Sequence, residues 1–589
     1  MSRLKSIANL ENALPLLALA WIEFFCFFPA MRKVGFYLDD WATMAYLHFA
    51  PKNQGIFEFF KYYLLNDSRV QNRPLEVIHF GLIHWLFGGE PFPFHLTNVL
   101  LEIFAGYLAY LVFLRVSESR AISLLAAIFF ILHPGHDSSH YWVICSSVTL
   151  SLCLYLGSLV CLFHFSDGLQ AGSSGAQGQG KPRVLWAAAS SLCFFLSLLN
   201  YETLLPLAAV NVLLVFFAMF AGREKTQGQL MYALKVAAGV AALMALPVVL
   251  LLGYLKVVMP LLGKGYVHGV IFDLETMLQI VGSGVDLNTP LTLFCFVFQQ
   301  ASNTFGEITK GDWLHLAAIS LVSFLSVFLL CQIDLRRTDE ASSKSQFSNK
   351  GTSGVWLVLI GIIGVIASYS IFGLNAEYTP TYYTILNRIN AGASFCSAII
   401  LLGFLKLAND NAPARASGVV PFALAFLAAL FASAFTLANL ALAKPWVASW
   451  ATQTAIKKNI VAHAAELGRA PSLLLVNCPR YVLWSPVFDG VWDFSNMLRI
   501  ALDDFNVNGN VISERLILDA KGVTDISHGF KCGQYPFSKL FLFVAPEGPL
   551  ERVVDGPGFV ETVERKGMSF GLAPDTIVKW KKELHSSSY

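Results

Sequence analysis

The stretch ALPLLALAWIEFFCFFPAMRKVGFYLDDW (residues 13–41) joins a long apolar run to a pair of adjacent carboxylates. Residues 13–31 are long for the apolar part of a signal peptide and lack a clear A-x-A cleavage site. A helix needs about 20 apolar residues to cross a bilayer, so we interpret the run as an uncleaved first span. Asp39 and Asp40 then lie at the membrane surface where that span ends.

Composition places the whole chain in the membrane. It has 589 residues, of which 55% are hydrophobic and only 14% are charged. A soluble chain carries about 25% charged residues, so we predict a polytopic membrane protein. The net charge of +2 indicates little, because charge distribution among loops sets membrane topology. No basic run and no zinc-like Cys/His spacing is present, so no nucleic-acid partner is expected.

Apolar runs predict about eleven transmembrane helices. They lie near residues 13–31, 95–114, 121–133, 142–164, 184–199, 203–221, 236–257, 314–332, 354–373, 389–407 and 419–442. Cytoplasmic loops tend to be basic, and an N-terminus inside places most of the basic loops inside. We therefore expect a multi-pass protein of the plasma (inner) membrane, with a transmembrane domain at 1–445 and an extracytoplasmic domain at 446–589.

The C-terminal part alternates strand-like and helical segments. Residues 473–477 and 540–544 are typical of strands, and residues 450–467 and 495–503 are typical of helices. We predict a small α/β domain outside the membrane. Cys478 and Cys532 are the cysteines of this part, and they could form a disulfide outside the cytoplasm or remain two free thiols.

The first outer loop breaks the charge rule, because it holds several Lys and Arg residues. Within it, RPLEVIHFGLIHWLFG (residues 73–88) starts with a proline suited to the first helical turn. Arg73, Glu76 and His79 share one side of this helix, which predicts an amphipathic helix in the outer interface. Arg73 is a candidate for binding phosphate, and the alternative is a pair with Glu76 or a lipid headgroup.

Further polar residues fall on the same outer face under this topology, among them Asp137, Glu202 and Arg388. The loop at 375–390 is rich in Tyr and Asn and ends with Arg388 at the mouth of a span. Arginine binds phosphate oxygens through two parallel hydrogen bonds, and Tyr382 is suited to contact a sugar. The alternative is an interfacial aromatic belt with a snorkelling arginine.

A histidine tract raises the question of a metal. His133, His136 and His140, with Asp137, have the spacing H-x-x-H-D-x-x-H. On one helix these side chains would share a face. Pro134 and Gly135 break a helix at this point, so we expect no metal, and no cofactor is indicated elsewhere.

Several motifs in order resemble a known family. They are Asp39-Asp40, Asn72-Arg73-Pro74-Leu75, Leu86-Phe87-Gly88, the string PFPFHLTNVLL at 91–101, His133-Pro134 and Trp142. This series resembles the transmembrane and tetratricopeptide-repeat O-mannosyltransferases and their bacterial relatives. More broadly it is similar to the C-type membrane glycosyltransferases. The resemblance covers roughly residues 33–205, and no tetratricopeptide repeat follows the spans.

The resemblance implies a polyprenyl-phosphate sugar donor and an acidic catalytic base in the first outer loop. By position, Asp39 matches the family's catalytic acid and Asp40 its acidic neighbour, while His95 falls in the shared F-H-L-x-N motif. Glu202 matches the acidic member of a Lys-Glu pair whose Lys is missing here. Where relatives carry a Gly-Arg-x-Asp-like segment this chain has CSSV at 145–148, and Asp137 is the alternative for that acid.

We therefore expect a glycosyltransferase acting by inversion, with Asp39 as general base and Arg388, with Arg73, holding the phosphate of the donor. The acceptor is a hydroxyl group on a protein, a lipid or a glycan of the cell envelope, and the sequence does not name the sugar. The rival hypothesis is a multi-pass transporter or lipid flippase, a class in which inverted repeats and charges at the bilayer midplane are common. We find no convincing internal repeat, and the charges gather at one end of the spans.

Overall fold

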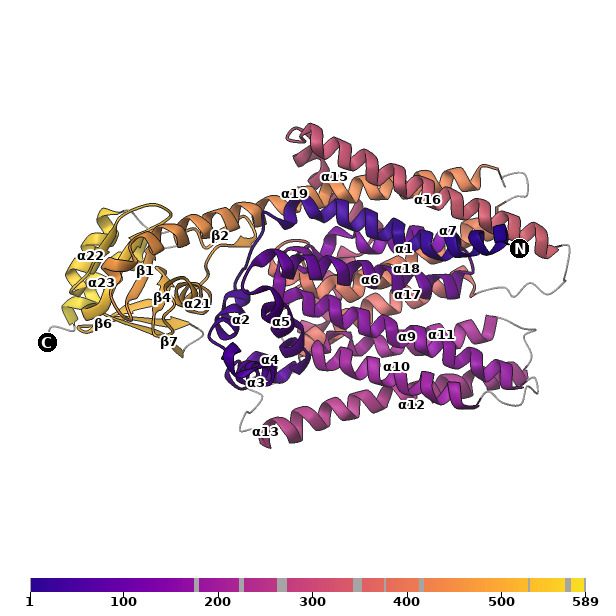
Figure 1. Cartoon of the computed structure of the whole chain (residues 1–589), viewed down its shortest axis with the longest axis horizontal. Coiled ribbons are helices and arrows are strands. Elements are labelled where there is room, and N and C mark those ends of the chain that lie inside the picture. The colour runs from indigo at the N-terminus through magenta and orange to yellow at the C-terminus, as the bar shows by residue number, and fades with distance from the viewer. Residues whose placement is uncertain are drawn as a thin grey trace.

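The computed structural model describes residues 2–173, 180–221, 227–261, 273–342, 352–374, 378–412, 418–527, 530–566 and 574–586. Residues 375–377 of the expected outer loop lie outside this set. The described chain forms a bundle of long helices with a small strand-containing domain beyond one end (Figure 1). We name this end of the bundle the domain end; α1 begins near the opposite end. The predicted fold class is confirmed.

Nine helices in the described residues are long and apolar enough to cross a membrane. The helices that carry these spans are α1 (Ser2–Met31), α6 (Pro91–Ser117), α9 (Ser146–Ser173), α11 (Ala208–Ala221), α12 (Gln227–Gly253), α16 (Lys310–Ser342), α17 (Gly354–Ser370), α18 (Ala391–Asp410) and α19 (Val420–Ala462). Two other predicted spans are shorter apolar helices, Arg120–His136 and Val184–Asn200. The second of these is the apolar part of α10 (Gly180–Asn200).

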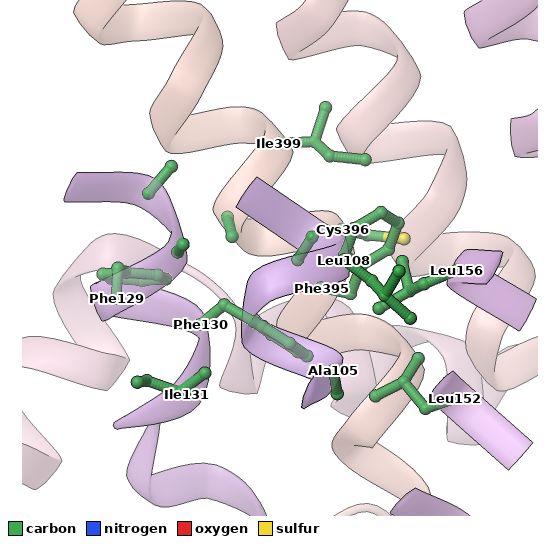
Figure 2. Packing of buried hydrophobic residues seen from close by; sticks show 14 of the residues in the cluster. Ala105, Leu108, Phe129, Phe130, Ile131, Leu152, Leu156, Phe395, Cys396 and Ile399 are labelled. Carbon is green, nitrogen blue, oxygen red and sulfur yellow. The ribbon is translucent and has the colours of Figure 1, made fainter. Parts of the chain in front are cut away.

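Helix α7 (Arg120–Ile131) is too short to cross the bilayer alone. Its 12 residues span about 18 Å, against a hydrocarbon thickness of about 30 Å. All residues from Ala121 to Ile131 are buried, because α6, α16, α18 and α19 pack around the helix. Large side chains of α7 interlock with α6, α9 and α18 in the bundle core (Figure 2). The following residues, 132–145, remain almost entirely buried and form a loop that we name the inserted loop.

Residues 274–305 form a broken helix. Helices α14 (Leu274–Leu287) and α15 (Pro290–Phe305) meet at an angle of 63° and together are apolar enough for one broken span or a re-entrant loop. Asn288 and Thr289 separate them, and Thr289 caps α15 by accepting a hydrogen bond from the backbone of Thr292.

Four short helices of the predicted first outer loop gather at the domain end (Figure 1). They are α2 (Asp39–His48), α3 (Ile56–Asn66), α4 (Ser68–Asn72) and α5 (Pro74–Phe87). Pro74 occupies the first turn of α5, where its missing N–H costs nothing. The expected helix at 73–88 is therefore present, although Glu76 on its polar side is buried.

The C-terminal domain holds a four-stranded sheet with the order β4-β1-β8-β9, in which β1 pairs in parallel with β4 and β8. A separate antiparallel sheet has the order β5-β6-β7, and β2 pairs with β3. Cys478 and Cys532 are free thiols. The strands and helices of this domain are α20 (Ala464–Leu467), β1 (Ser472–Val476), β2 (Tyr481–Val482), β3 (Ser485–Pro486), α21 (Val491–Leu502), β4 (Asn508–Val511), β5 (Leu516–Leu518), β6 (Gly522–Ser527), β7 (Phe530–Pro536), β8 (Leu540–Val544), β9 (Leu550–Arg552), α22 (Gly556–Arg565) and α23 (Pro574–Ser586).

The first-loop helices and the C-terminal domain share one apolar core. Alternate residues of β1 point to opposite faces of the sheet. Leu473 and Leu475 join a cluster that includes Trp41 of α2 and Phe59 of α3, while Leu474 lies in the cluster on the other face. Helix α19 runs without interruption past the expected domain boundary at 445/446 and carries the chain into this domain. The C-terminal domain therefore fixes the position of α2, which begins with the two aspartates.

Candidate functional site

The chain makes a constrained turn just before α2. Leu38 adopts φ 45° and ψ −113°, a conformation that costs an L-residue roughly 1–3 kcal/mol. The neighbouring Tyr37 is held from both sides of the turn: its hydroxyl donates to the carbonyl of Trp446 at 2.6 Å, and its backbone N–H donates to Asp40 Oδ2 at 2.9 Å. These bonds keep the strained turn in place at the start of α2, whose first residue is Asp39.

Asp40 is the structural member of the aspartate pair. Its carboxylate is 1% exposed and accepts hydrogen bonds from the backbone N–H of Tyr37 and, at 2.8 Å, of Ile144 in the inserted loop. Burial raises the pKa of the Asp40 carboxyl well above its ordinary value, and these backbone donors oppose the shift. The side chain thus joins the start of α2 to the inserted loop, and no substrate can reach it without displacing these bonds.

Asp39 is the accessible member. Its side chain is 45% exposed, and Arg69 Nη1 lies 3.9 Å from Asp39 Oδ2. Arg69 is held mainly by Asp67, to which it donates from Nε at 3.1 Å and from Nη2 at 2.7 Å. Asp39 therefore keeps oxygen atoms free to accept a proton or a hydrogen bond from a substrate.

Arg388 lies in the 3-10 helix η7 (Ile385–Asn390) at the mouth of α18. Its guanidinium donates to the carbonyl of Ile385 at 2.6 Å and lies 5.1 Å from the ring centroid of Trp142 and 5.6 Å from that of Tyr378. Within the described chain, which omits residues 375–377, no carboxylate lies within 4.0 Å of this guanidinium. An arginine held by aromatic rings without a carboxylate partner is suited to bind an anion.

Trp142 of the inserted loop connects Arg388 to the aspartate turn. The indole Nε1 donates to the carbonyl of Tyr37 at 2.9 Å, while the same ring lies against Arg388. The Cys145 side chain, three residues later, lies within electrostatic range of Arg388, Asp40 and Asp39. A carboxylate that can accept a proton and a guanidinium that can bind an anion are therefore held at one locus.

Arg73 has carboxylate partners. Its Nη2 lies 3.4 Å from Glu202 Oε1, its Nη1 lies 3.9 Å from Glu76 Oε1, and the guanidinium lies 4.2 Å from the ring centroid of Tyr201. Tyr201 is also in electrostatic range of Arg388, so this pair borders the same locus. Because Glu202 and Glu76 offset its charge, Arg73 is the weaker anion ligand of the two arginines.

Two other predicted site residues serve as buried connections. His95 Nε2 donates to the carbonyl of Gly35 at 3.0 Å, and the side chain is 1% exposed. Asp137 is fully buried and accepts a hydrogen bond from Trp446 Nε1 at 3.0 Å and another from the Asn387 amide. The His95 bond ties α6 to the segment between α1 and α2, and the Asp137 bonds tie the inserted loop to α19 and η7, so both side chains are engaged in structural contacts.

Tyr382 also turns inward. Its ring stacks on Phe296 of α15 with centroids 4.1 Å apart, and its hydroxyl donates to the carbonyl of Leu287. The side chain is buried, and it ties the 378–384 segment to the broken helix. Tyr378, whose ring lies beside Arg388, is the tyrosine of this loop that borders the locus.

The histidine tract does not converge on one point. The rings of His133 and His136 stack with centroids 5.8 Å apart, and His136 and His140 are 5.2 Å apart. His133 Nδ1 accepts from the backbone of Gly135, and His136 Nδ1 bonds to Ser394 Oγ at 3.1 Å. Among the described residues, these three histidines do not form a group whose ligand atoms all lie within 4.8 Å of one another.

Sequence reasoning gave no role to three residues that shape this locus. Trp142 was noted only within a family motif, and Tyr201 and Arg69 were not singled out. The first two have an available signal, since aromatic residues next to the charges of an outer loop often stack on arginine. The contact between Arg69 and Asp39 depends on how α2 and α4 pack and has no local signal.

Comparisons with known proteins give a weak match. The sequence matches no protein-family model and no curated protein. The chain is similar to a crystal structure of ArnT from Cupriavidus metallidurans in the apo state, with 14% identity, 85% of each chain covered and a TM-score of 0.32. It is also similar to ArnT from the same organism bound to undecaprenyl phosphate, with 13% identity, 85% of each chain covered and a TM-score of 0.28.

Proposed function

We propose that this chain is a membrane glycosyltransferase that moves a sugar from a polyprenyl-phosphate donor to an acceptor hydroxyl. One observation carries the proposal. Trp142 donates to the carbonyl of Tyr37, two residues before the accessible Asp39, and its ring lies 5.1 Å from Arg388. Trp142 thus links the turn that precedes a candidate proton acceptor to a candidate anion ligand, and transfer from a phosphate leaving group requires both kinds of group.

Arg388 binds the donor phosphate. Its planar guanidinium offers paired donors to phosphate oxygens, and the rings of Trp142 and Tyr378 fix its plane. As the bond between the anomeric carbon and the phosphate oxygen breaks, negative charge grows on the leaving phosphate. The guanidinium stabilises that charge, which lowers the barrier.

Asp39 acts on the acceptor. One of its carboxylate oxygens takes the proton of the acceptor hydroxyl while the acceptor oxygen forms a bond to the anomeric carbon. The polyprenyl phosphate leaves from the opposite face with the electron pair of the broken bond. A single displacement inverts the configuration at that carbon. The acceptor belongs to a protein, a lipid or a glycan.

The domain end is the extracytoplasmic end in this proposal. Arg69 and Arg73 belong to a basic loop at this end, and anionic lipid phosphates are suitable partners for such a loop. The donor then enters sideways from the outer leaflet of the plasma (inner) membrane. The C-terminal domain, which packs on α2, stands beside the path of the acceptor.

The test is the Asp39→Asn substitution in the full chain, with envelope glycans measured by mass spectrometry. We expect loss of the gene-dependent sugar modification, because removing a general base lowers the rate by about 10²–10⁴-fold. The matched control is Glu58→Gln, since Glu58 lies in the same loop, is 47% exposed and pairs with Lys61 at 3.2 Å. The control should keep the modification at the wild-type level.

Unchanged modification in Asp39→Asn at equal expression would remove Asp39 from the reaction. Movement of labelled polyprenyl phosphate across vesicles by purified protein, with no modification lost in either variant, would instead support the flippase alternative.

A further inference from the structure

Three metal-ligating side chains meet inside the bundle, away from the locus of Asp39 and Arg388. Glu23 lies on α1, Glu102 lies on α6, and His140 lies on α8 (Ser138–Tyr141) of the inserted loop. One ligand atom from each lies within 4.8 Å of the other two. His140 Nδ1 is 2.7 Å from Glu102 Oε2 and 3.9 Å from Glu23 Oε1. Glu23 is 0% exposed, Glu102 7% and His140 4%.

Several polar atoms of this group have no hydrogen-bond partner among the described residues, although Glu102 accepts from Asn98 and bonds to His140. Neither carboxylate oxygen of Glu23 accepts a hydrogen bond from a described residue, and the same holds for Asn98 Oδ1. Asn98 belongs to the group, because its amide nitrogen lies 3.3 Å from Glu102 Oε1. A buried carboxylate without hydrogen bonds is costly in an apolar bundle, so a ligand that accepts its lone pairs would remove a large penalty.

The two carboxylates of this group also favour binding of a cation. In the described part of the chain, no Lys or Arg nitrogen lies within 4.0 Å of either one. One divalent cation bound by two carboxylates and a neutral histidine gives a site with no net charge. Magnesium and calcium take mostly oxygen ligands, six or more in number, whereas a histidine with carboxylates suits zinc or manganese.

A small cavity adjoins the group. Its volume is about 20 Å³, and the polar part of its lining consists of Glu102, His136, Ser139, His140 and Thr149. This is room for one water molecule, which needs about 10–15 Å³ by the same measure. The cavity can therefore hold a water ligand beside the three protein ligands.

We propose that Glu23, Glu102 and His140 bind one divalent transition-metal ion, with Asn98 Oδ1 and a water in the cavity as sources of further ligands. The ion ties α1 and α6 to the inserted loop. The loop residues Trp142 and Ile144, just past His140, donate to Tyr37 and Asp40. The metal thus stabilises the loop that positions the proposed site, and its existence does not depend on the reaction proposed above.

The experiment measures metal content by mass spectrometry on the purified, tag-free full chain, and thermal unfolding of chelator-treated protein with and without added Zn²⁺ or Mn²⁺. We expect about one divalent ion per chain, and an unfolding temperature that rises when one of these ions is restored. Glu23→Gln and His140→Asn should each lose the ion and the temperature shift. Asp334→Asn is the control, because Asp334 is a carboxylate on another helix, paired with Arg120, and the ion should remain.

A wild-type chain with no metal above background and no shift with either ion would overturn the proposal, and the two carboxylates would then share protons with His140. A bound ion that remains in both Glu23→Gln and His140→Asn would overturn it as well. If a variant fails to fold, the metal content and temperature shift of the wild type still decide whether an ion binds, and Glu102→Gln serves as the replacement variant. Neither measurement uses sugar transfer, so this proposal and the proposed function fail separately.

Discussion

The locus of Asp39 and Arg388 and the group of Glu23, Glu102 and His140 carry opposite imbalances of charge. At the locus, Arg388 has no described carboxylate partner, and Asp39 is 45% exposed. In the buried group, two carboxylates have no described arginine or lysine partner, and Glu23 is fully buried. The first arrangement favours an anion that arrives from outside, and the second favours a cation that stays.

The inserted loop links the two regions. His140 belongs to the buried group, and Trp142, two residues later, supports Arg388. A loop buried in a bundle has to satisfy its backbone and side chains internally. Here the inserted loop contributes His140 to the buried group and Trp142 to the locus of Asp39 and Arg388. Comparing the two regions therefore distinguishes polar groups whose partners are in the protein from polar groups that need a ligand.

The largest expected effect is at Arg388. Arg388→Ala removes two charge-assisted hydrogen bonds to phosphate, each worth about 1.5–3 kcal/mol, so transfer should fall by at least about 100-fold in kcat/KM. Arg388→Lys keeps the charge but not the planar fork, and should give an intermediate value. Steady-state rates against donor concentration measure both.

Arg32→Ala is the matched control for this comparison. Arg32 also lies against two aromatic rings, with Phe28 at 5.2 Å and Phe92 at 5.5 Å, and neither of them is a ring that contacts Arg388. Its rate should stay within about twofold of wild type, since an exposed cation–π contact is worth only about 0.5–1 kcal/mol. Equal losses in both variants would mean that the effect is general to stacked arginines and not specific to the locus.

A smaller effect is expected at Trp142. Trp142→Phe keeps an aromatic ring beside Arg388 and removes the donor to Tyr37, whose carbonyl still accepts from the backbone of Asp40 at 2.9 Å. Losing one hydrogen bond of about 0.5–1.5 kcal/mol should lower transfer by about 10-fold or less and reduce the unfolding temperature slightly. Trp484→Phe is the control, because its indole N–H has no described partner. If Trp142→Phe and Trp484→Phe transfer sugar at the same rate, the bond from Trp142 to Tyr37 does not couple Asp39 to Arg388 in the reaction.

The smallest expected effect on sugar transfer is at Asp493, a buried carboxylate that, unlike Glu23, has hydrogen-bond donors. Asp493 is fully buried but accepts hydrogen bonds from the backbone N–H groups of Asp489, Gly490 and Phe494. Burial raises the pKa of Asp493 to about 7, against these donors. Because the folded pKa lies above the unfolded one, the folded state binds more protons, and this group's contribution to stability falls as pH rises from about 4 to about 7.

Thermal unfolding between pH 4.5 and 8 checks this contribution. Asp493→Asn should flatten the decline with pH, whereas Asp555→Asn, at the exposed cap of α22, should keep it. A slope that is the same in wild type and Asp493→Asn would show that this carboxyl does not titrate in the window.

The spans and strands could be predicted because their signals are local. The span at 13–31 and the strand at 540–544 match the observed bounds, since continuous apolar runs determine both. The end of α19 was predicted too early, at 442. The sequence predicted a span at 419–442 and a separate helical segment at 450–467, but one continuous helix with Pro445 inside it covers most of both. Helix α7 is short because the chain leaves it at Ile131 and continues as the buried inserted loop. This burial depends on the packing of α6, α16, α18 and α19, which has no local sequence signal.

The site was harder to predict because burial depends on distant partners. Asp39 and Asp40 are adjacent in sequence, yet the side chain of Asp39 is exposed, whereas that of Asp40 is fixed by Ile144, 104 residues away. Asp137 is held by Trp446, 309 residues away. Glu23 and Glu102 had a signal that was not used: a single acidic residue inside an apolar span is costly and marks a partner or a ligand.

The most direct measurement of the central claim, that Asp39 and Arg388 divide the work of one site, is the binding of undecaprenyl phosphate to purified wild-type, Asp39→Asn and Arg388→Ala chains by native mass spectrometry, alongside their transfer rates. We predict that Asp39→Asn binds the lipid as the wild type does and transfers no sugar, while Arg388→Ala loses both binding and transfer. Equal lipid binding by Arg388→Ala and wild type, or full transfer by Asp39→Asn, would contradict the claim.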